Sequence, residues 1–153
     1  MATKKTKIKT IKENIKIIKI QRKHFSQVVK LLSKNLTSFL PLLKNYQKIW
    51  KSFSSQKSMN AIVVLQKNIV IGYGTIFFER KIRGGNLGHI EDIVIDKKFQ
   101  SKGLGRKIIK KLTEIGKKKN CYKISLQCSK KQHVRFYNKC GYKANGYVMQ
   151  KIL

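Results

Sequence analysis

The stretch IDKKFQSKGLGRKII, residues 95–109, contains residue types and spacings that can bind a phosphate group. It places Gly103 and Gly105 between an apolar run and a pattern typical of an amphipathic helix. The first N–H groups of a helix have no partner within it, and the helix dipole adds partial positive charge there. Glycines let an anion approach these groups, and Lys102, Arg106 and Lys107 add charge. Because neither a Walker A loop nor a full GxGxxG pattern is present, the glycine pair is equally consistent with an ordinary turn.

Two further sets of side chains can move protons. Glu91 and Asp92 are adjacent acids within an apolar segment of a chain that has only 6 acidic residues. Adjacent side chains of a regular strand point to opposite faces, so we expect one acid on each face. Tyr137 lies in a helical pattern, where it can either donate a proton or pack against the core.

The three cysteines give no sign of a metal site or of disulfide bonds. Cys121, Cys128 and Cys140 are odd in number and have no CxxC spacing, which argues against zinc and against a disulfide framework. We therefore expect free thiols in a reducing compartment and no metal. A nucleophilic cysteine would need a neighbouring base, and nothing adjacent in the sequence suggests one.

These residues must be positioned by strands and helices, which the apolar periodicity predicts. Alternating or continuous apolar runs predict strands at 14–20, 59–66, 69–79, 89–95, 121–128 and 142–153. Apolar residues three and four apart predict helices that begin at about Phe25, Pro41, Leu104 and Lys131.

Turn residues mark several boundaries of these elements. Ser26 is a plausible cap of the first helix, and Lys67-Asn68 forms a hairpin turn between two strands. Gly72 and Gly74 indicate a bulge or a close backbone approach inside a strand. Residues 80–88 are expected to form a loop, and Gly141 to close the last helix. The mixed order of strands and helices predicts one α/β domain over residues 13–153, preceded by a basic tail at 1–12.

The composition limits the class of protein. Hydrophobic residues make up 41% of the 153 residues, which is typical of one globular domain, and no apolar run is long enough to span a membrane. The basic start lacks the apolar core of a secretory signal, so we expect a disordered tail, with a transit sequence as the alternative, and a cytosolic protein. The net charge of +30 favours anionic partners, but the lysines are spread over nearly all solvated positions and not grouped on one face, so we prefer to interpret them as background over a nucleic-acid-binding surface.

The wider sequence resembles the GNAT superfamily of N-acetyltransferases. Gln100, Gly103 and Gly105 match the acetyl-CoA loop pattern Gln/Arg-x-x-Gly-x-Gly/Ala, and Ile95 is the apolar residue five positions before it. The strings ERKI, GHIEDI, CYKI and FYNKCGY have the order and spacing of the eukaryotic glucosamine 6-phosphate N-acetyltransferases. This resemblance is strong over residues 57–150 and loose before them.

The resemblance implies a fold, a reaction and a cofactor site. It implies a mixed, mostly antiparallel sheet, splayed at its central strands and flanked by about four helices. It also implies acetyl transfer from acetyl-CoA to the 2-amino group of glucosamine 6-phosphate in UDP-N-acetylglucosamine biosynthesis, by an intertwined homodimer. The residues expected to contact acetyl-CoA are Ile93, Val94, Ile95, Gln100, Ser101, Lys102, Gly103, Leu104, Gly105, Arg106 and Tyr137.

The resemblance also assigns roles to single residues. The N–H of Ile93 would polarise the thioester carbonyl, and Tyr137 would protonate the departing thiolate. Glu91 would contact sugar hydroxyls and Asp92 the amine. The remaining residues expected to contact the substrate are Thr37, Lys81, Arg83, Gln127 and, from the other subunit of the dimer, Lys151.

Three departures from the family pattern leave alternatives open. Gln127 replaces a common acid, one extra residue precedes His133, and the loop at 80–88 is about two residues short. A glutamine can still orient the amine, and His133 is either a base or a solvated helix residue. One alternative is an acetyltransferase that acts on a polyamine or a protein, although a strongly positive chain should repel a polycationic acceptor. The other is a basic nucleic-acid-binding protein, for which no recognised motif is present.

Overall fold

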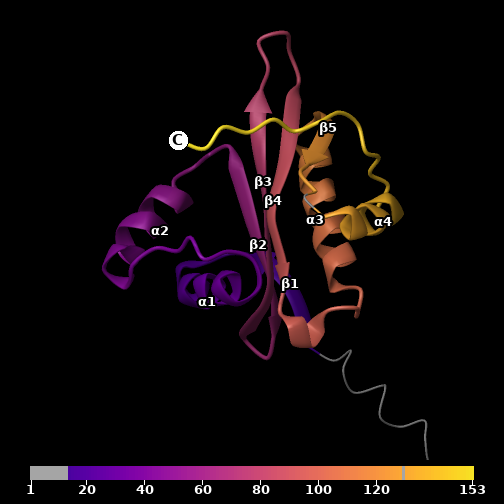
Figure 1. The fold of residues 1–153 in the computed structure, drawn as a ribbon. Helices are drawn as coiled ribbons and strands as arrows, with labels where there is room; N and C mark the ends of the chain where they lie inside the picture. Colours follow the sequence, from indigo (N-terminus) through magenta and orange to yellow (C-terminus); the bar gives the residue numbers. More distant parts are fainter. Residues whose placement is uncertain (1–13, 129) are drawn as a thin grey trace, which may run out of the picture.

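The computed structural model describes residues 14–128 and 130–153, which form one five-stranded sheet with α-helices on both sides (Figure 1). The strands are β1 (Ile15–Lys19), β2 (Met59–Gln66), β3 (Ile69–Arg80), β4 (Asn86–Ile95) and β5 (Cys121–Leu126), in that order across the sheet. The α-helices are α1 (Phe25–Asn35), α2 (Tyr46–Ser54), α3 (Leu104–Lys118) and α4 (Lys131–Lys139). Neighbouring strands are antiparallel except β4 and β5. The predicted α/β architecture is confirmed, whereas the predicted tail at 1–12 lies outside the described residues.

The central strands are covered on both faces. Val63 and Val64 of β2 are adjacent and therefore point to opposite faces, yet both are fully buried. On one face, α1 packs against a cluster that includes Val63 and Tyr73. On the other face, α3 packs against a cluster that includes Val64, Ile76 and Ile90. We call these the α1 face and the α3 face. The continuous apolar runs in the sequence follow from this double burial.

The β2–β3 hairpin and helix α3 form as the sequence predicts. Lys67 and Asn68 both have positive φ angles, 47° and 66°, as a two-residue hairpin turn of type I′ requires. In α3, Ile108 and Leu112 are fully buried on one side, while the basic residues lie on the exposed side. Helix α4 ends before Gly141, whose φ of 88° breaks the helix as expected.

The first helix begins at Phe25 as predicted but without the predicted cap, and the second begins later than predicted. A 3₁₀ turn at Arg22–His24 leads directly into α1, and the His24 ring accepts the N–H of Gln21 at 3.1 Å. The predicted cap, Ser26, is the second residue of α1, because the 3₁₀ turn at Arg22–His24 runs directly into a helix that begins at Phe25. Helix α2 begins at Tyr46 after a second 3₁₀ turn, so Pro41 precedes the helix and does not open it.

The β3–β4 hairpin is longer than expected, and its loop is shorter. The two strands pair as far as Arg80 and Asn86, which leaves a loop of only 81–85 in place of the predicted 80–88. Gly84 and Gly85 adopt φ angles of 89° and 80°, which allow this tight connection. The hairpin therefore extends past the helices (Figure 1).

The predicted final strand at 142–153 is wrong. This segment pairs with no strand and instead runs across the end of the sheet (Figure 1). Tyr147, Met149, Ile152 and Leu153 are almost fully exposed. The alternation that predicts a strand is present, but the described part of this chain gives these side chains no surface on which to bury.

Candidate active site at the β4 bulge and the following loop

Strand β4 contains an extra residue opposite the middle of β3. The pairing passes from Tyr73 with Val94 to Thr75 with Glu91, so one residue of β3 faces two of β4. At this point Asp92 adopts a φ of 52°, a left-handed conformation that is uncommon for an aspartate in a strand. The hydroxyl of Thr75, which is buried, donates to the carbonyl oxygen of Glu91 at 3.0 Å and ties the bulge to β3.

The residue of β3 that faces the bulge must be a glycine. A Cβ built on Gly74 would lie 2.7 Å from Cδ1 of Ile93 and 2.9 Å from Cγ2 of Ile108. Both contacts are closer than real Cβ atoms approach, so β4 and α3 occupy the space of a side chain. Of the two alternatives predicted for Gly72 and Gly74, the bulge is confirmed opposite Gly74, and the atoms that crowd both glycines belong to side chains.

The bulge places both acids on the α1 face. Ile90 and Ile93 belong to the same apolar cluster on the α3 face although they are three residues apart. Regular alternation would place them on opposite faces, so the inserted residue turns Glu91 and Asp92 away from α3 together. The Asp92 charge also raises the pKa of Tyr73, a residue of the α1 face, after the larger effect of burial. The expectation that the two acids point to opposite faces is therefore wrong.

The surroundings of the two acids weaken their acidity. Desolvation raises the pKa of Glu91, the neighbouring Asp92 charge raises it further, and His89 partly offsets the shift. Desolvation alone raises the pKa of Asp92, although its side chain is in contact with solvent. Each carboxylate is therefore a stronger base than an ordinary surface acid.

Strand β5 separates from β4 at the bulge. The pairing of β4 with β5 ends at Ile90 and Leu126, whereas β4 continues to Ile95. The backbone of residues 93–95 therefore faces no β5 partner among the described residues. The Val94 and Ile95 side chains are buried, so the peptide groups of this segment are its polar groups that a ligand can meet. The expected splay of the sheet at this strand is confirmed.

The loop after β4 is held by its own polar side chains. The Asp96 carboxylate accepts the N–H of Lys98 at 2.9 Å and begins a 3₁₀ turn at Lys97–Phe99. The Gln100 amide donates to the carbonyl oxygen of Ile95 at 3.1 Å. Gln100 thus fixes the loop against the end of β4, which positions the start of α3.

The start of α3 presents unpartnered amides beside open space. Gly103 has a φ of 76°, and a Cβ built there would meet nothing within 4 Å. The first bond of the helix joins the Lys107 N–H to the Gly103 carbonyl at 3.2 Å, so the N–H groups of residues 104–106 have no partner within the helix. Gly105 has another role: its Cβ would lie 3.2 Å from the Phe136 ring, so this glycine allows α4 to pack closely. The residues present thus fit a phosphate-bearing ligand at Gly103.

Tyr137 lies on α4 among aromatic residues. Its ring packs edge-on against Phe136 and Tyr142 at centroid distances of 5.0 and 6.5 Å. Burial raises the pKa of the phenol, and the nearby Cys128 and Cys140 raise it further. The phenol therefore carries its proton at neutral pH, as a general acid must.

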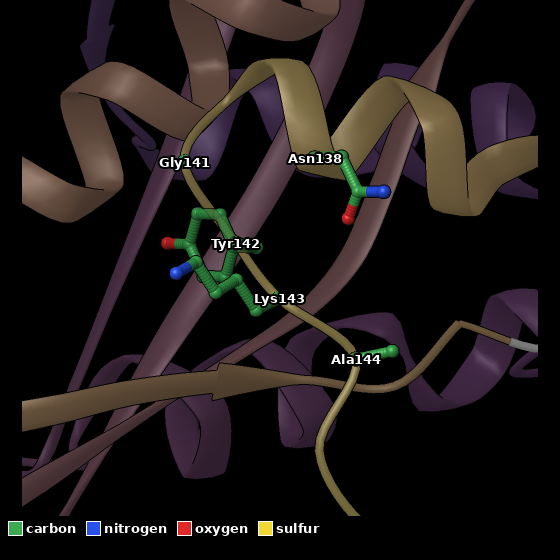
Figure 2. Close-up of a pocket in the computed structure, with 5 residues that line it drawn as sticks. All are labelled: Asn138, Gly141, Tyr142, Lys143 and Ala144. Atoms are coloured by element: carbon green, nitrogen blue, oxygen red, sulfur yellow. The ribbon is translucent and has the colours of Figure 1, made fainter.

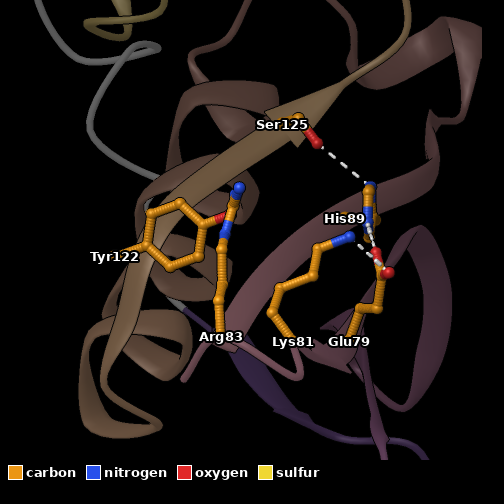
Figure 3. Close-up of polar contacts among 6 residues, drawn as sticks. All are labelled: Glu79, Lys81, Arg83, His89, Tyr122 and Ser125. Carbon is orange, nitrogen blue, oxygen red and sulfur yellow. Dashed lines mark hydrogen bonds and ion pairs between the residues drawn. The ribbon is translucent and has the colours of Figure 1, made fainter. Parts of the chain in front are cut away.

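The predicted phosphate-binding cations lie at the β3–β4 hairpin and are held by side chains that the sequence does not reveal (Figure 3). The Lys81 ammonium contacts the Glu79 carboxylate, and the Arg83 guanidinium donates to the Tyr122 hydroxyl at 3.1 Å. Arg83 also lies 5.9 Å over the Tyr122 ring. His89 contacts the second oxygen of Glu79 at 3.1 Å.

The other predicted substrate residues are not brought to this cluster. The Thr37 hydroxyl accepts the N–H of Phe39 at 3.0 Å in the turn after α1, and it contacts none of the acids or cations above. The side-chain oxygen of Gln127, Oε1, accepts a hydrogen bond from the side-chain Nε2 of Gln150 at 3.4 Å. This contact places the C-terminal segment, including the exposed Lys151, beside the end of β5. His133 is exposed on α4, consistent with a solvated residue.

Concavity alone does not locate the site. A shallow hollow of about 400 Å³ follows α4 and includes none of the predicted site residues; it is lined by Asn138, Gly141, Tyr142, Lys143 and Ala144 (Figure 2). Over residues 14–128 and 130–153, no group of three or more His, Cys, Asp or Glu side chains is placed to hold a metal ion. No helix in the described ranges is long and apolar enough to cross a membrane.

Comparison with known proteins links this geometry to a family. A model of the acetyltransferase (GNAT) family matches residues 25–142. Glucosamine 6-phosphate N-acetyltransferase of Candida albicans is 36% identical over 110 residues, which are 69% of this chain and 73% of that protein. Glucosamine 6-phosphate N-acetyltransferase 1 of Dictyostelium discoideum is 44% identical over 89 residues, 57% of this chain and 56% of that protein. The crystal structure of glucosamine-6-phosphate N-acetyltransferase from Arabidopsis thaliana superimposes with a TM-score of 0.83 at 28% identity, covering 92% of this chain and 99% of that one.

Proposed function

The chain belongs to the acetyltransferase (GNAT) family, and we propose that it acetylates the 2-amino group of D-glucosamine 6-phosphate with acetyl-CoA, on the route to UDP-N-acetylglucosamine in the cytosol. The observation that carries this proposal is the bulge of β4. It turns Glu91 and Asp92 to one face at the point where β5 leaves the strand edge open. The family model, which spans residues 25–142, includes this strand and loop, and two relatives named glucosamine 6-phosphate N-acetyltransferase are 36% and 44% identical to this chain over 110 and 89 residues.

Acetyl-CoA, the cosubstrate, supplies an activated acyl group. The open edge of β4 at residues 93–95 offers peptide groups to an extended chain such as the pantetheine arm. The amides of residues 104–106, with Gly103 leaving open space beside them, offer donors and partial positive charge to the pyrophosphate. Lys102 and Arg106 add cationic side chains, while Gln100 holds the loop in place.

The proton transfers are assigned to three side chains. Asp92 and Glu91, with raised pKa values, accept hydrogen bonds from the amino sugar. These bonds orient the neutral amine for attack on the thioester. The N–H of Ile93 stabilises the oxyanion that develops as the amine attacks. Tyr137, protonated at neutral pH, gives its proton to the departing thiolate, and the proton that the amine loses on forming the amide restores the phenol.

The phosphate distinguishes this acceptor from other amines. Lys81 and Arg83 place two cations at the hairpin end of the sheet, in the loop that joins β3 to β4, the strand that carries the acids. An acetyltransferase for polyamines would need acidic surroundings for its cationic acceptor, whereas this chain has a net charge of +30. Thr37 and Gln127 remain proposed contacts, to the sugar and to its amine respectively.

We also propose that the enzyme is a homodimer. Residues 142–153 expose Tyr147, Met149, Ile152 and Leu153 almost completely, which is unusual for a monomer. If this segment packs against a second subunit, the Lys151 that it carries would reach the phosphate of the substrate bound to that subunit. Sedimentation equilibrium tests the dimer. A molecular mass of one chain at every protein concentration measured would contradict it.

The acceptor is tested by the release of free thiol from acetyl-CoA. We expect turnover with glucosamine 6-phosphate and, since the phosphate contacts are then lost, little or none with glucosamine. Spermidine and a lysine peptide serve as the alternative acceptors. Faster turnover with either of these, or equal turnover of glucosamine with and without its phosphate, would contradict the proposed acceptor.

A further inference from the structure

The polar contacts around Lys81 form a continuous chain across three strands (Figure 3). The Lys81 ammonium contacts Oε1 of Glu79 at the end of β3. The other carboxylate oxygen, Oε2, lies 3.1 Å from Nε2 of His89 on β4. Nδ1 of His89 then lies 3.0 Å from the hydroxyl of Ser125 on β5. One carboxylate and one imidazole thus connect the ammonium to a strand on the far side of the hairpin.

The carboxylate of Glu79 fixes the direction of the two hydrogen bonds that it makes. The pKa of Glu79 is lowered by its hydrogen bond to Lys81 and then by that to His89, so the carboxylate is ionised and only accepts. Nε2 of His89 must therefore carry a proton. In the neutral imidazole Nδ1 then accepts from the Ser125 hydroxyl, and in the charged imidazolium Nδ1–H donates to the hydroxyl oxygen, so the contact is a hydrogen bond in either form. Every bond in the chain is directed from a donor to a matching acceptor.

The chain lies on the face of the sheet that carries the two acids. His89 is two residues before Glu91 in a regular part of β4, and it affects the pKa of that acid. Ser125 lies between Ile124 and Leu126, both of which pack on the α3 face, so its side chain points to the α1 face. The ammonium of Lys81 has three donors, of which Glu79 takes one, and 28% of its side chain is exposed. Donors therefore remain for an anion on this face.

We propose that Ser125 and His89 are positioning residues that, through Glu79, hold the Lys81 ammonium where it binds the phosphate of the acceptor sugar. The inference rests on the proposed function for the identity of that phosphate. A lysine side chain without a partner samples many rotamers, and fixing them on ligand binding costs affinity. A chain anchored on β5 fixes the ammonium before the ligand arrives. Ser125 thus affects the acceptor without touching it.

A matched pair of variants isolates the hydroxyl. Ser125→Thr keeps the donor and Ser125→Val removes it, while threonine and valine have nearly the same shape and both suit a strand. We expect the KM for glucosamine 6-phosphate to be about 3- to 10-fold higher for the valine than for the threonine variant, as expected for one lost hydrogen bond. The KM for acetyl-CoA and the thermal midpoint should agree between the two. Equal KM values for the sugar phosphate would overturn the proposal.

The route through Lys81 has its own test. In a Lys81→Met background, the threonine and valine variants should have the same KM for glucosamine 6-phosphate, because the ammonium that Ser125 positions is gone. A threonine-to-valine difference that persists in this background would show that Ser125 acts by another path, and the positioning role would be wrong.

A non-reactive ligand separates this inference from the proposed function. D-Glucose 6-phosphate carries the phosphate but no amine, and its binding can be measured by calorimetry. Weaker binding to the valine than to the threonine variant supports the positioning role even if the chain fails to acetylate glucosamine 6-phosphate. If acetylation occurs but the two variants bind D-glucose 6-phosphate equally, or if neither variant binds it, the proposed function stands and the positioning role is overturned.

Discussion

Replacing Gly74 with alanine should disturb both the stability of the fold and the geometry of the site. The added Cβ would lie 2.7 Å from Cδ1 of Ile93, 2.9 Å from Cγ2 of Ile108 and 3.2 Å from Cδ1 of Leu112. Ile108 and Leu112 are fully buried on the inner side of α3, so they have little room to move. Overpacking of this kind costs about 1–3 kcal/mol. The backbone of Gly74 is not left-handed, so an alanine suffers the clash without conformational strain.

The effect should appear in two measurements. For a domain of this length, a loss of 1–3 kcal/mol lowers the thermal midpoint by about 2–12 °C. The clash also pushes Ile93, the residue next to Asp92 in the bulge, so the donor and the acid that the proposed mechanism needs are displaced together. Misplacement by a fraction of an ångström should lower kcat/KM by about 10- to 100-fold at temperatures where the variant is folded.

A second substitution tests whether the clash is the cause. Ile93→Val removes the Cδ1 atom that lies nearest to the new Cβ. The double variant Gly74→Ala/Ile93→Val should therefore be less destabilised than the sum of the single variants by more than about 0.5 kcal/mol, measured by urea unfolding. Additive effects, or a Gly74→Ala protein as stable and active as the wild type, would refute the packing argument.

Three further outcomes are expected at the site. Tyr137→Phe should lower the acetyl-transfer rate by about 100-fold, as for a lost general acid, with little change in the calorimetric Kd for acetyl-CoA; an equal loss in both would remove the acid role. Gly103→Ala should lower the free energy of unfolding by about 1–2 kcal/mol because of its φ of 76°, and Gly103→Asn by clearly less; equal losses in urea unfolding would contradict the left-handed strain. The raised pKa of Glu91 means that the folded protein binds the carboxyl proton more tightly than the unfolded chain does. The contribution of Glu91 to the free energy of unfolding therefore falls as the pH rises above about 4. Glu91→Gln should therefore stabilise the protein at pH 7 but not at pH 3, and urea unfolding at the two pH values checks the sign.

Features that depend on neighbouring residues could be predicted from the sequence. The Lys67-Asn68 turn, the apolar face of α3 and the break at Gly141 each follow from a few adjacent residues and their φ preferences. The loop from Gln100 to Gly105 belongs to the same class, because its strand, turn and helix are contiguous. The start of α1 at Phe25 also follows from the local pattern, whereas its cap and the start of α2 at Tyr46 do not, because a 3₁₀ turn precedes each of these helices.

Features that depend on strand register could not be predicted. The shared face of Glu91 and Asp92 follows from one inserted residue of β4; Gly74 indicates a bulge, but nothing in the sequence shows that the extra residue lies on the partner strand. The strings ERKI and GHIEDI contain Glu79 and His89, but their contact depends on a loop of 81–85, four residues shorter than expected. Ser125 joins them only because β5 runs parallel to β4 in one particular register.

The register also decides how the charge of this chain can act. With 36 basic and 6 acidic residues, nearly every surface attracts anions, so net charge alone cannot select a small phosphate over any other anion. In the described part of the chain, both ion pairs involve Glu79, and one of them holds Lys81. The Glu79 carboxylate partly neutralises the Lys81 ammonium, which weakens the attraction of Lys81 for other anions but holds it in a defined position. Because selectivity depends on position more than on total charge, the acid that neutralises part of the field is what makes one cation specific.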